Sequence, residues 1–197
     1  MTAAEVIANG GVVAFRTDTF YGLGVDPFNA AAVARLREVK GREDNKPILL
    51  LISDAAQVER LIASCSDQFK MAAREFWPGP LTIIGEAVST LPEEITAGTG
   101  TVGVRLPADE SVRQFVRECG GVLTATSANP AGREPARSAR EVASYFTPHF
   151  KDGFDVIVDG GEVTATEPST VLDVLTSPPR IVREGAIPRS VIEQLFA

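Results

Sequence analysis

The segment GVVAFRTDTFYGLG, Gly11 to Gly24, places an apolar run, a polar loop and two glycines next to one another. The first five residues predict a buried β-strand, because short apolar runs rich in β-branched residues favour strands. Thr17, Asp18 and Thr19 then put three hydroxyl or carboxylate side chains at the end of this strand, where a plain surface turn could be shorter. We therefore expect a loop that hydrogen-bonds a ligand.

The composition fits a globular protein with one domain over residues 1–197. The chain is 44% hydrophobic and 23% charged, and its length allows a sizeable core. We expect a cytoplasmic protein without membrane association, since the sequence shows neither a secretory signal nor an apolar run of membrane-spanning length. The net charge of −7 argues against broad nucleic-acid binding, although it leaves room for a local cationic pocket. Cys65 and Cys119 predict neither a disulfide framework nor a zinc site.

Capping residues and apolar runs divide the chain into helices and strands. Helices are expected after Thr2, Asn29, Ser53, Ser66, Asp109 and Ser138, and close to Pro188. Strands are expected within residues 11–15, 46–52, 81–88, 101–107, 121–126, 154–161, 169–175 and 180–185. Because the two kinds of element do not alternate strictly, we expect an α/β (α+β) fold with a twisted mixed β-sheet flanked by helices.

Several patterns resemble known sites but occur in the wrong context. The segment GTGTVG, Gly98 to Gly103, has the spacing of a dinucleotide fingerprint, but a strand-like run follows it where that fingerprint needs a helix. A serine hydrolase would have to use the single histidine, His149, yet Ser127 lacks the nucleophile elbow. Asp159 and Asp173 could hold a cation or cap turns, and both alternatives stay open.

Cationic side chains gather near the expected strands. Lys40, Arg42 and Lys46 lie within seven positions, just ahead of an apolar strand whose end could be a ligand site. Such residues are often only solvated, but here they could converge on a carboxylate or polyphosphate. Arg105 and Arg183 lie inside apolar strands, where a charge needs a partner.

Two further loops carry compact hydrogen-bonding side chains. Thr126, Ser127 and Asn129 follow one expected strand in TATSANPAG, and Ser169 and Thr170 precede another in EPSTVLD. Each loop alone could be an Asx or serine turn. Three hydroxyl-rich loops beside a set of lysines and arginines predict a pocket for a polar, anionic substrate.

The motifs TDTFYGLG, KGREDNKPILLL, FWPGPLT, VGVRLP, TSANPAG, PSTVLD and REG occur in the order typical of YrdC-like L-threonylcarbamoyladenylate synthases. The chain resembles the short, single-domain branch of this family from its first strand to Gly185. The resemblance implies a twisted mixed sheet around a deep, positively charged concave surface. It also implies the formation of threonylcarbamoyl-AMP and pyrophosphate from L-threonine, bicarbonate and ATP. A separate transferase would then modify adenosine 37 of tRNA with this intermediate.

The resemblance also implies roles for individual residues. The catalytic set is Lys40, Arg42, Ser127 and Asn129. The set for threonine and carbamate is Thr19, Tyr21, Lys46 and Arg105. The set for ATP adds Thr126, Ser169 and Arg183 to the catalytic four. Mg²⁺ is expected to arrive with the triphosphate rather than on protein ligands.

The chain departs from the family pattern at two positions. Arg16 stands where proline is usual, and Ala131 where serine is frequent.

The main alternative function is a module that binds double-stranded RNA or tRNA in the same concavity, which the acidic net charge disfavours. Hydrogenase-maturation carbamoyltransferases share a similar domain but carry zinc-finger and acylphosphatase-like domains in addition. A sugar-phosphate enzyme would need more acidic metal ligands in its first loop.

Overall fold

The computed structural model describes residues 1–40, 46–130, 132–146 and 155–197. Its helices are α1 (Ala3–Ala8), α2 (Ala30–Val39), the 3-10 helix η1 (Ala55–Arg60), α3 (Asp67–Phe76), α4 (Glu93–Thr96), α5 (Glu110–Glu118), α6 (Ala139–Phe146) and α7 (Arg189–Leu195). Its strands are β1 (Val13–Arg16), β2 (Tyr21–Gly24), β3 (Leu50–Ile52), β4 (Leu81–Glu86), β5 (Thr101–Arg105), β6 (Val122–Thr124), β7 (Thr126–Ser127), β8 (Val156–Val158), β9 (Thr170–Asp173) and β10 (Arg180–Arg183). Among these elements, no helix is long and apolar enough to cross a membrane.

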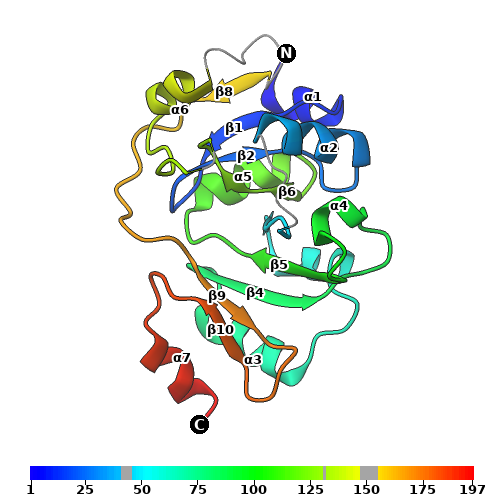
Figure 1. The fold of residues 1–197 in the computed structure, drawn as a ribbon, viewed down its shortest axis with the longest axis vertical. Coiled ribbons are helices and arrows are strands. Elements are labelled where there is room, and N and C mark those ends of the chain that lie inside the picture. The colour runs from blue at the N-terminus through cyan, green and yellow to red at the C-terminus, as the bar shows by residue number, and fades with distance from the viewer. Residues whose placement is uncertain (41–45, 131, 147–154) are drawn as a thin grey trace.

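The predicted mixed α/β class is confirmed, with the strands divided between two sheets. A four-stranded sheet has the order β7-β2-β1-β8, and a six-stranded sheet has the order β10-β9-β4-β5-β3-β6. Both are mixed, since β1 pairs antiparallel with β2 and parallel with β8, and β4 pairs antiparallel with β5 and parallel with β9. The four-stranded sheet lies at the N-terminal end of the long axis with α1, α2 and α6, and β9, β10, α3 and α7 lie at the opposite end (Figure 1).

The chain passes from the large sheet to the small one at Ala125. The strand β6 pairs with β3 up to Thr124, and β7 begins to pair with β2 at Thr126. Thr124 is fully buried, and its hydroxyl accepts a hydrogen bond from the amide of Val25 at 2.9 Å. The two sheets are therefore joined at the segment that leads into TSANPAG.

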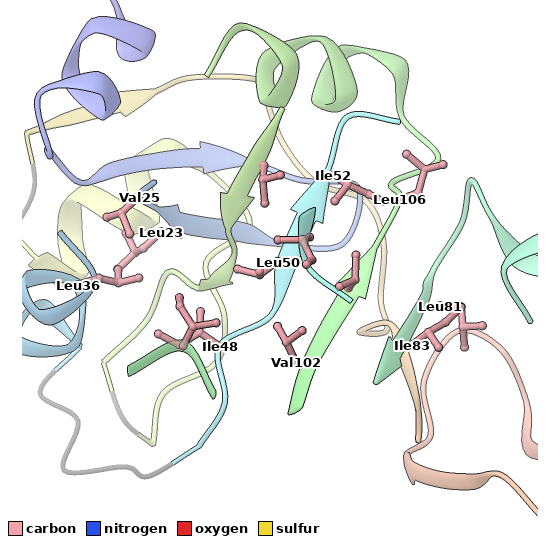
Figure 2. Close-up of a cluster of buried hydrophobic side chains, with 14 of the residues drawn as sticks. Leu23, Val25, Leu36, Ile48, Leu50, Ile52, Leu81, Ile83, Val102 and Leu106 are labelled. Carbon is pink, nitrogen blue, oxygen red and sulfur yellow. The ribbon is translucent and has the colours of Figure 1, made fainter. Parts of the chain in front are cut away.

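Both sheets and α2 share one apolar core. Figure 2 shows Leu23, Val25, Leu36, Leu50, Ile52 and Val102 among its fully buried members. The alternation of side chains along β5 separates two environments, because Val102 and Val104 join this core while Gly103 and Arg105 line a cavity on the other face. Apolar burial thus fixes which residues of the sheet face the cavity.

The predicted caps are confirmed except at one position. Thr2, Asn29, Ser66, Asp109 and Ser138 each accept a backbone hydrogen bond at the start of a helix. The prediction for Ser53 was wrong, because the carboxylate of Asp54 accepts the amide of Ala56 and begins η1. The hydroxyl of Ser53 instead donates to that carboxylate at 2.7 Å.

The segment after the polar loop is a strand, which was not among the strands expected from the sequence. Tyr21 to Gly24 form β2, because glycine here permits close packing instead of reversing the chain. A Cβ atom on Gly24 would lie 2.7 Å from the ring of Phe15 and 3.2 Å from the carbonyl oxygen of Thr124. The absence of this side chain lets β2 fit between β1 and the end of β6.

An ion pair and a hydrogen bond join the turn after β1 to the loop after β5. Arg16 Nη1 lies 2.6 Å from Asp109 Oδ2, while Asp109 Oδ1 accepts the amide of Ser111 at 2.8 Å and caps α5. Asp18 Oδ2 accepts the amide of Ala108 at 3.2 Å. These contacts join the small sheet to the large one, and they give Arg16, the departure from the family pattern, a definite structural role.

The ion pair predicts a pH-dependent contribution to stability. The hydroxyl of Ser111 and then the guanidinium of Arg16 lower the pKa of Asp109 from 3.8 to about 2. Because the folded-state pKa is depressed, the contribution is fully present above about pH 4 and is lost as the pH falls through about 2. We expect Asp109→Asn, which keeps a capping side chain, to lower the free energy of unfolding by about 0.5–1 kcal/mol at pH 7. Urea unfolding from pH 7 down to pH 3 should show this difference shrinking; a constant difference would contradict the assignment.

Candidate functional site

A cavity of about 590 Å³ is lined by residues of both sheets. Its walls come from the turn after β1, from residues 46–49 ahead of β3 and from residues 125–127 at the crossing between the sheets. The remaining wall is the face of β4, β5, β9 and β10 that does not enter the core. A cavity of this volume suits a small-molecule ligand.

The structure brings most of the predicted site residues to this cavity. Those that line it are Thr19, Tyr21, Lys46, Arg105, Thr126, Ser127, Ser169 and Arg183. Lys40 lines a much smaller neighbouring cavity together with Thr126, and Asn129 lies in the turn beyond Ser127. Arg42, Ala131 and His149 lie outside the described residues.

Lys40 and Asn129 hold the turn that presents Ser127 to the cavity. The ammonium of Lys40, a buried residue at the end of α2, donates to the carbonyl oxygens of Ser127 at 2.5 Å and Asn129 at 2.7 Å. It also donates to Oδ1 of Asn129 at 3.2 Å, while Nδ2 of Asn129 donates to the carbonyl oxygen of Arg133. In this arrangement Lys40 supports the turn, and the direct contact with an anion stays a prediction.

Arg105 carries a buried charge at the cavity wall. Its side chain is 3% exposed, and Nη1 lies 3.0 Å from Oδ1 of Asp18, which confirms that this cation has a charged partner. Burial lowers the pKa of Arg105, and the charge of Asp18 opposes that effect. The ion pair lacks hydrogen-bond geometry, so Nε and Nη1 donate to no acceptor among the described residues. Nη2 donates only weakly, at 3.4 Å, to the hydroxyl of Thr19.

Arg183 brings a second guanidinium to the same cavity. Its Nε and Nη2 donate to the carbonyl oxygen of Ser169 at 3.2 and 2.9 Å. Burial and then the charge of Arg105 lower the pKa of Arg183. Because the two guanidiniums repel each other while lining one cavity, a bound anion would relieve that repulsion.

Some polar groups of the first loop form hydrogen bonds within the loop itself. The hydroxyl of Thr17 donates to the carbonyl oxygen of Phe20 at 2.6 Å and accepts the amides of Thr19 and Phe20, each at 3.2 Å. Thr17 therefore closes the turn. Thr19 is the residue of this loop whose hydroxyl contacts Arg105. The opening expectation of a ligand-binding loop thus concerns Thr19 more than Thr17.

The hydroxyl of Tyr21 holds the loop after β8. It donates to the carbonyl oxygen of Gly161 at 2.8 Å and accepts the amide of Gly160 at 3.1 Å. Burial is the largest cause that raises its pKa, and the carboxylate of Asp159, 3.3 Å away, adds to it. Asp159 thus belongs to this loop, and Asp173 pairs with Arg180 at 3.2 Å. Over the described ranges, no three His, Cys, Asp or Glu side chains are grouped to hold a metal ion.

Thr82 and Gly103 are among the cavity residues that were not singled out from the sequence. Thr82 is buried on β4, where it is the one polar residue of the run LTII, and its hydroxyl lies 2.9 Å from that of Ser169. A polar residue inside an apolar strand was the available signal. Gly103 lines the cavity beside it, and a Cβ atom there would lie 3.0 Å from Cγ2 of Thr82.

The sequence matches known proteins over nearly its whole length. Residues 5–185 match the Sua5/yciO/yrdC family model, whose description is telomere recombination. The threonylcarbamoyl-AMP synthase of Pyrococcus abyssi is 37% identical over 194 residues, which are 98% of this chain and 56% of that protein. The threonylcarbamoyl-AMP synthase of Thiobacillus denitrificans is 36% identical over 170 residues, which are 86% of this chain and 88% of that protein. The chain thus spans about half the length of the first relative and most of the second.

Solved structures share the same architecture. A crystal structure of P. abyssi Sua5 in complex with L-threonine has a TM-score of 0.92 at 36% identity, covering 99% of this chain and 56% of that one. E. coli YciO, at 24% identity over 94% of this chain and 88% of its own, has a TM-score of 0.80 and shows likeness of fold alone. Since the family model matches from α1 to the loop after β10, the chain belongs to the Sua5/yciO/yrdC family.

Proposed function

We propose that this chain is a threonylcarbamoyl-AMP synthase, which joins L-threonine, bicarbonate and ATP and releases pyrophosphate. The observation that carries the proposal is the cavity lined by the guanidiniums of Arg105 and Arg183 together with hydroxyl side chains. Such a cavity suits a small substrate with several anionic groups. Relatives that bear this name match 98% and 86% of the chain, and a related structure contains L-threonine.

The chemistry needs no nucleophile from the protein. The neutral amine of threonine forms a carbamate, either from bicarbonate with loss of water or from carbon dioxide with loss of a proton from the nitrogen. An oxygen of this carbamate attacks the α-phosphorus of ATP. The bond from the α-phosphorus to the bridging oxygen then breaks, and pyrophosphate leaves with the electron pair. The protein contributes by positioning the substrates and stabilising negative charge.

The described residues divide this work between the two sides of the cavity. The guanidinium of Arg105, whose Nη2 lies 3.4 Å from the hydroxyl of Thr19, is a donor for the carboxylate or carbamate of threonine. Arg183, Ser169 and Ser127 are donors for phosphate oxygens. Among the described residues, the cavity wall offers hydroxyls and guanidiniums rather than free carboxylates, so Mg²⁺ would be held by the triphosphate and neutralise its charge.

The same proposal includes the setting of the enzyme. Residues 1–197 are expected to work as one domain, which the shared core of the two sheets supports. The product would pass to a transferase that modifies tRNA, in the cytoplasm. Direct binding of RNA is the less favoured alternative, because the net charge is −7 and the cavity has the volume of a small-molecule site.

The first test is substrate dependence. With ATP, L-threonine, bicarbonate and Mg²⁺ present, we expect pyrophosphate release and a nucleotide product with the mass of threonylcarbamoyl-AMP. Omitting threonine or bicarbonate should reduce release to background, because the carbamate is the attacking group. Absence of release from folded protein with all four components would overturn the proposal.

Arg105 provides a test that separates charge stabilisation from folding. We expect Arg105→Met to lower kcat/KM for threonine by on the order of 10²–10³ and to destabilise the fold, because Asp18 is left buried and unpaired. The double variant Asp18→Asn with Arg105→Met should recover much of the stability without recovering activity. Thermal unfolding and initial rates measure the two effects; activity restored in the double variant would show that Arg105 only supports the fold.

Lys40 and Asn129 test the turn at Ser127. We expect Lys40→Ala and Asn129→Ala each to lower turnover by on the order of 10², because the loss of either side chain frees the turn. Lys70→Ala is the matched control, since Lys70 is exposed and paired only at 3.8 Å with Asp67. Full activity of either turn variant, measured as threonylcarbamoyl-AMP formed per minute, would remove the turn from the site.

A further inference from the structure

The hydroxyl of Thr170, at the start of β9, uses all of its hydrogen-bonding positions within the protein. It donates to the carbonyl oxygen of Ile187 at 2.7 Å, and it accepts the amides of Gly185 at 3.1 Å and Ile187 at 3.0 Å. A threonine hydroxyl has one hydrogen and two acceptor positions, and the direction of each bond is fixed because amides only donate and carbonyls only accept. This fully buried hydroxyl therefore has no position left for a ligand.

Thr170 fastens the chain that follows β10 to the segment ahead of β9. Next to its three bonds, the amide of Ala186 donates to the carbonyl oxygen of Pro168 at 3.0 Å. A Cβ atom on Gly185 would lie 2.9 Å from the carbonyl oxygen of Ser169, which is too close for any side chain. The two segments are therefore packed backbone against backbone.

Strand β10, at the edge of the large sheet beside β9 (Figure 1), contains a β-bulge. Ile181 pairs with Leu172, and both pack in the core. Arg183 pairs with Val171, and both line the cavity. Val182 is the extra residue between these pairs, and it lines the cavity as well. Because the side chains of a regular strand alternate between its faces, a strand without the bulge would turn Arg183 toward the core.

The orientation of Arg183 depends on the contact between the two fastened segments. Its Nε and Nη2 donate to the carbonyl oxygen of Ser169 at 3.2 and 2.9 Å. The bulge interrupts the ladder of backbone hydrogen bonds, so the strand alone does not fix this side chain. If the chain after Arg183 moved away from β9, the guanidinium would lose the acceptor that holds it at the cavity.

We infer that Thr170 is a positioning residue, which holds Arg183 at the cavity by fastening the chain on the far side of the bulge. Thr170 acts from behind the cavity wall and touches no substrate. The inference deepens the proposed function and rests on it for the kinetic test alone, because the position of Arg183 can also be measured without turnover. Both ATP and threonine carry anionic groups, so the kinetic test asks whether two variants affect the same substrate.

The position of Arg183 is measured by the exchange of its Nε hydrogen with water in ¹⁵N NMR spectra, where Arg183→Lys identifies the signal. The hydrogen bond to Ser169 should slow this exchange. Thr170→Val keeps the shape of threonine without the hydroxyl, and we expect it to speed the exchange about 10-fold. Thr170→Ser keeps the hydroxyl and should stay within about two-fold of the wild-type rate.

Thr124→Val is the matched control for a lost buried hydroxyl. Thr124 is as fully buried as Thr170, but it lies on β6, at the opposite edge of the large sheet from β10. Its hydroxyl also accepts a backbone amide. We expect this control to lower the thermal unfolding temperature and to leave the exchange of the Arg183 Nε hydrogen unchanged.

Initial rates test whether the position of Arg183 matters to the reaction. Arg183→Gln should raise the KM of one substrate, and Thr170→Val should lower kcat/KM for that same substrate about 10-fold while the KM of the other stays unchanged. Because Thr170 acts through Arg183, the Arg183→Gln/Thr170→Val double variant should be no worse than Arg183→Gln alone. A merely structural role would instead add its full loss to that of Arg183→Gln.

The outcomes separate this inference from the proposed function. Unchanged exchange of the Arg183 Nε hydrogen in Thr170→Val, or losses in kcat/KM that add fully, would overturn the role of Thr170. Should Thr170→Val fail to fold, Thr170→Ala in the same measurements decides between these results. If the wild type forms no threonylcarbamoyl-AMP, the proposed function fails, while the exchange rates still decide whether Thr170 positions Arg183.

Discussion

The buried ion pair of Asp18 and Arg105 is the constraint on which the arrangement of the two sheets depends. Asp18 lies in the turn after β1, whereas Arg105 ends β5 of the large sheet, and their side chains are only 13% and 3% exposed. Separating them would leave an uncompensated charge in the interior, at a cost of about 3–5 kcal/mol. The ion pair of Arg16 with Asp109 and the hydrogen bond from the amide of Ala108 to Asp18 join the same two loops. Several contacts therefore hold this part of the cavity wall in position.

The same pair gives the cavity its electrostatic character. Asp18 compensates one guanidinium, but Arg183 brings a second, and the charge of Arg105 lowers its pKa. Among the described residues, this wall therefore carries two guanidiniums and one paired carboxylate, although the whole protein has a net charge of −7. Local arrangement, rather than composition, decides which ligand this surface favours, because charges inside a cavity are screened less than those on the surface.

The sequence predicts local features better than contacts between distant segments. Apolar runs and caps located most helices and strands, since burial and unpaired amides at helix ends act over a few residues. The strand β2 was not among the predicted strands. The role of its Gly24, which is to admit the ring of Phe15 and the carbonyl oxygen of Thr124, depends on contacts with other strands. The need of Arg105 for a partner was predictable, whereas Asp18 as that partner depends on how the sheets meet.

Motifs identified the donors that line the cavity, but the structure shows what orients them. Lys40, expected to meet an anion, donates to the turn of Ser127 and Asn129, and Thr82 bonds to Ser169. A hydroxyl can rotate and can either donate or accept, so its value to a ligand depends on which of its positions the protein already occupies. A buried residue such as Lys40, which donates to the carbonyl oxygens of a turn, can therefore orient the groups of that turn without contact with the ligand. This explains why a cavity of hydroxyls and guanidiniums can be preorganised for an anion by side chains that lie behind its surface.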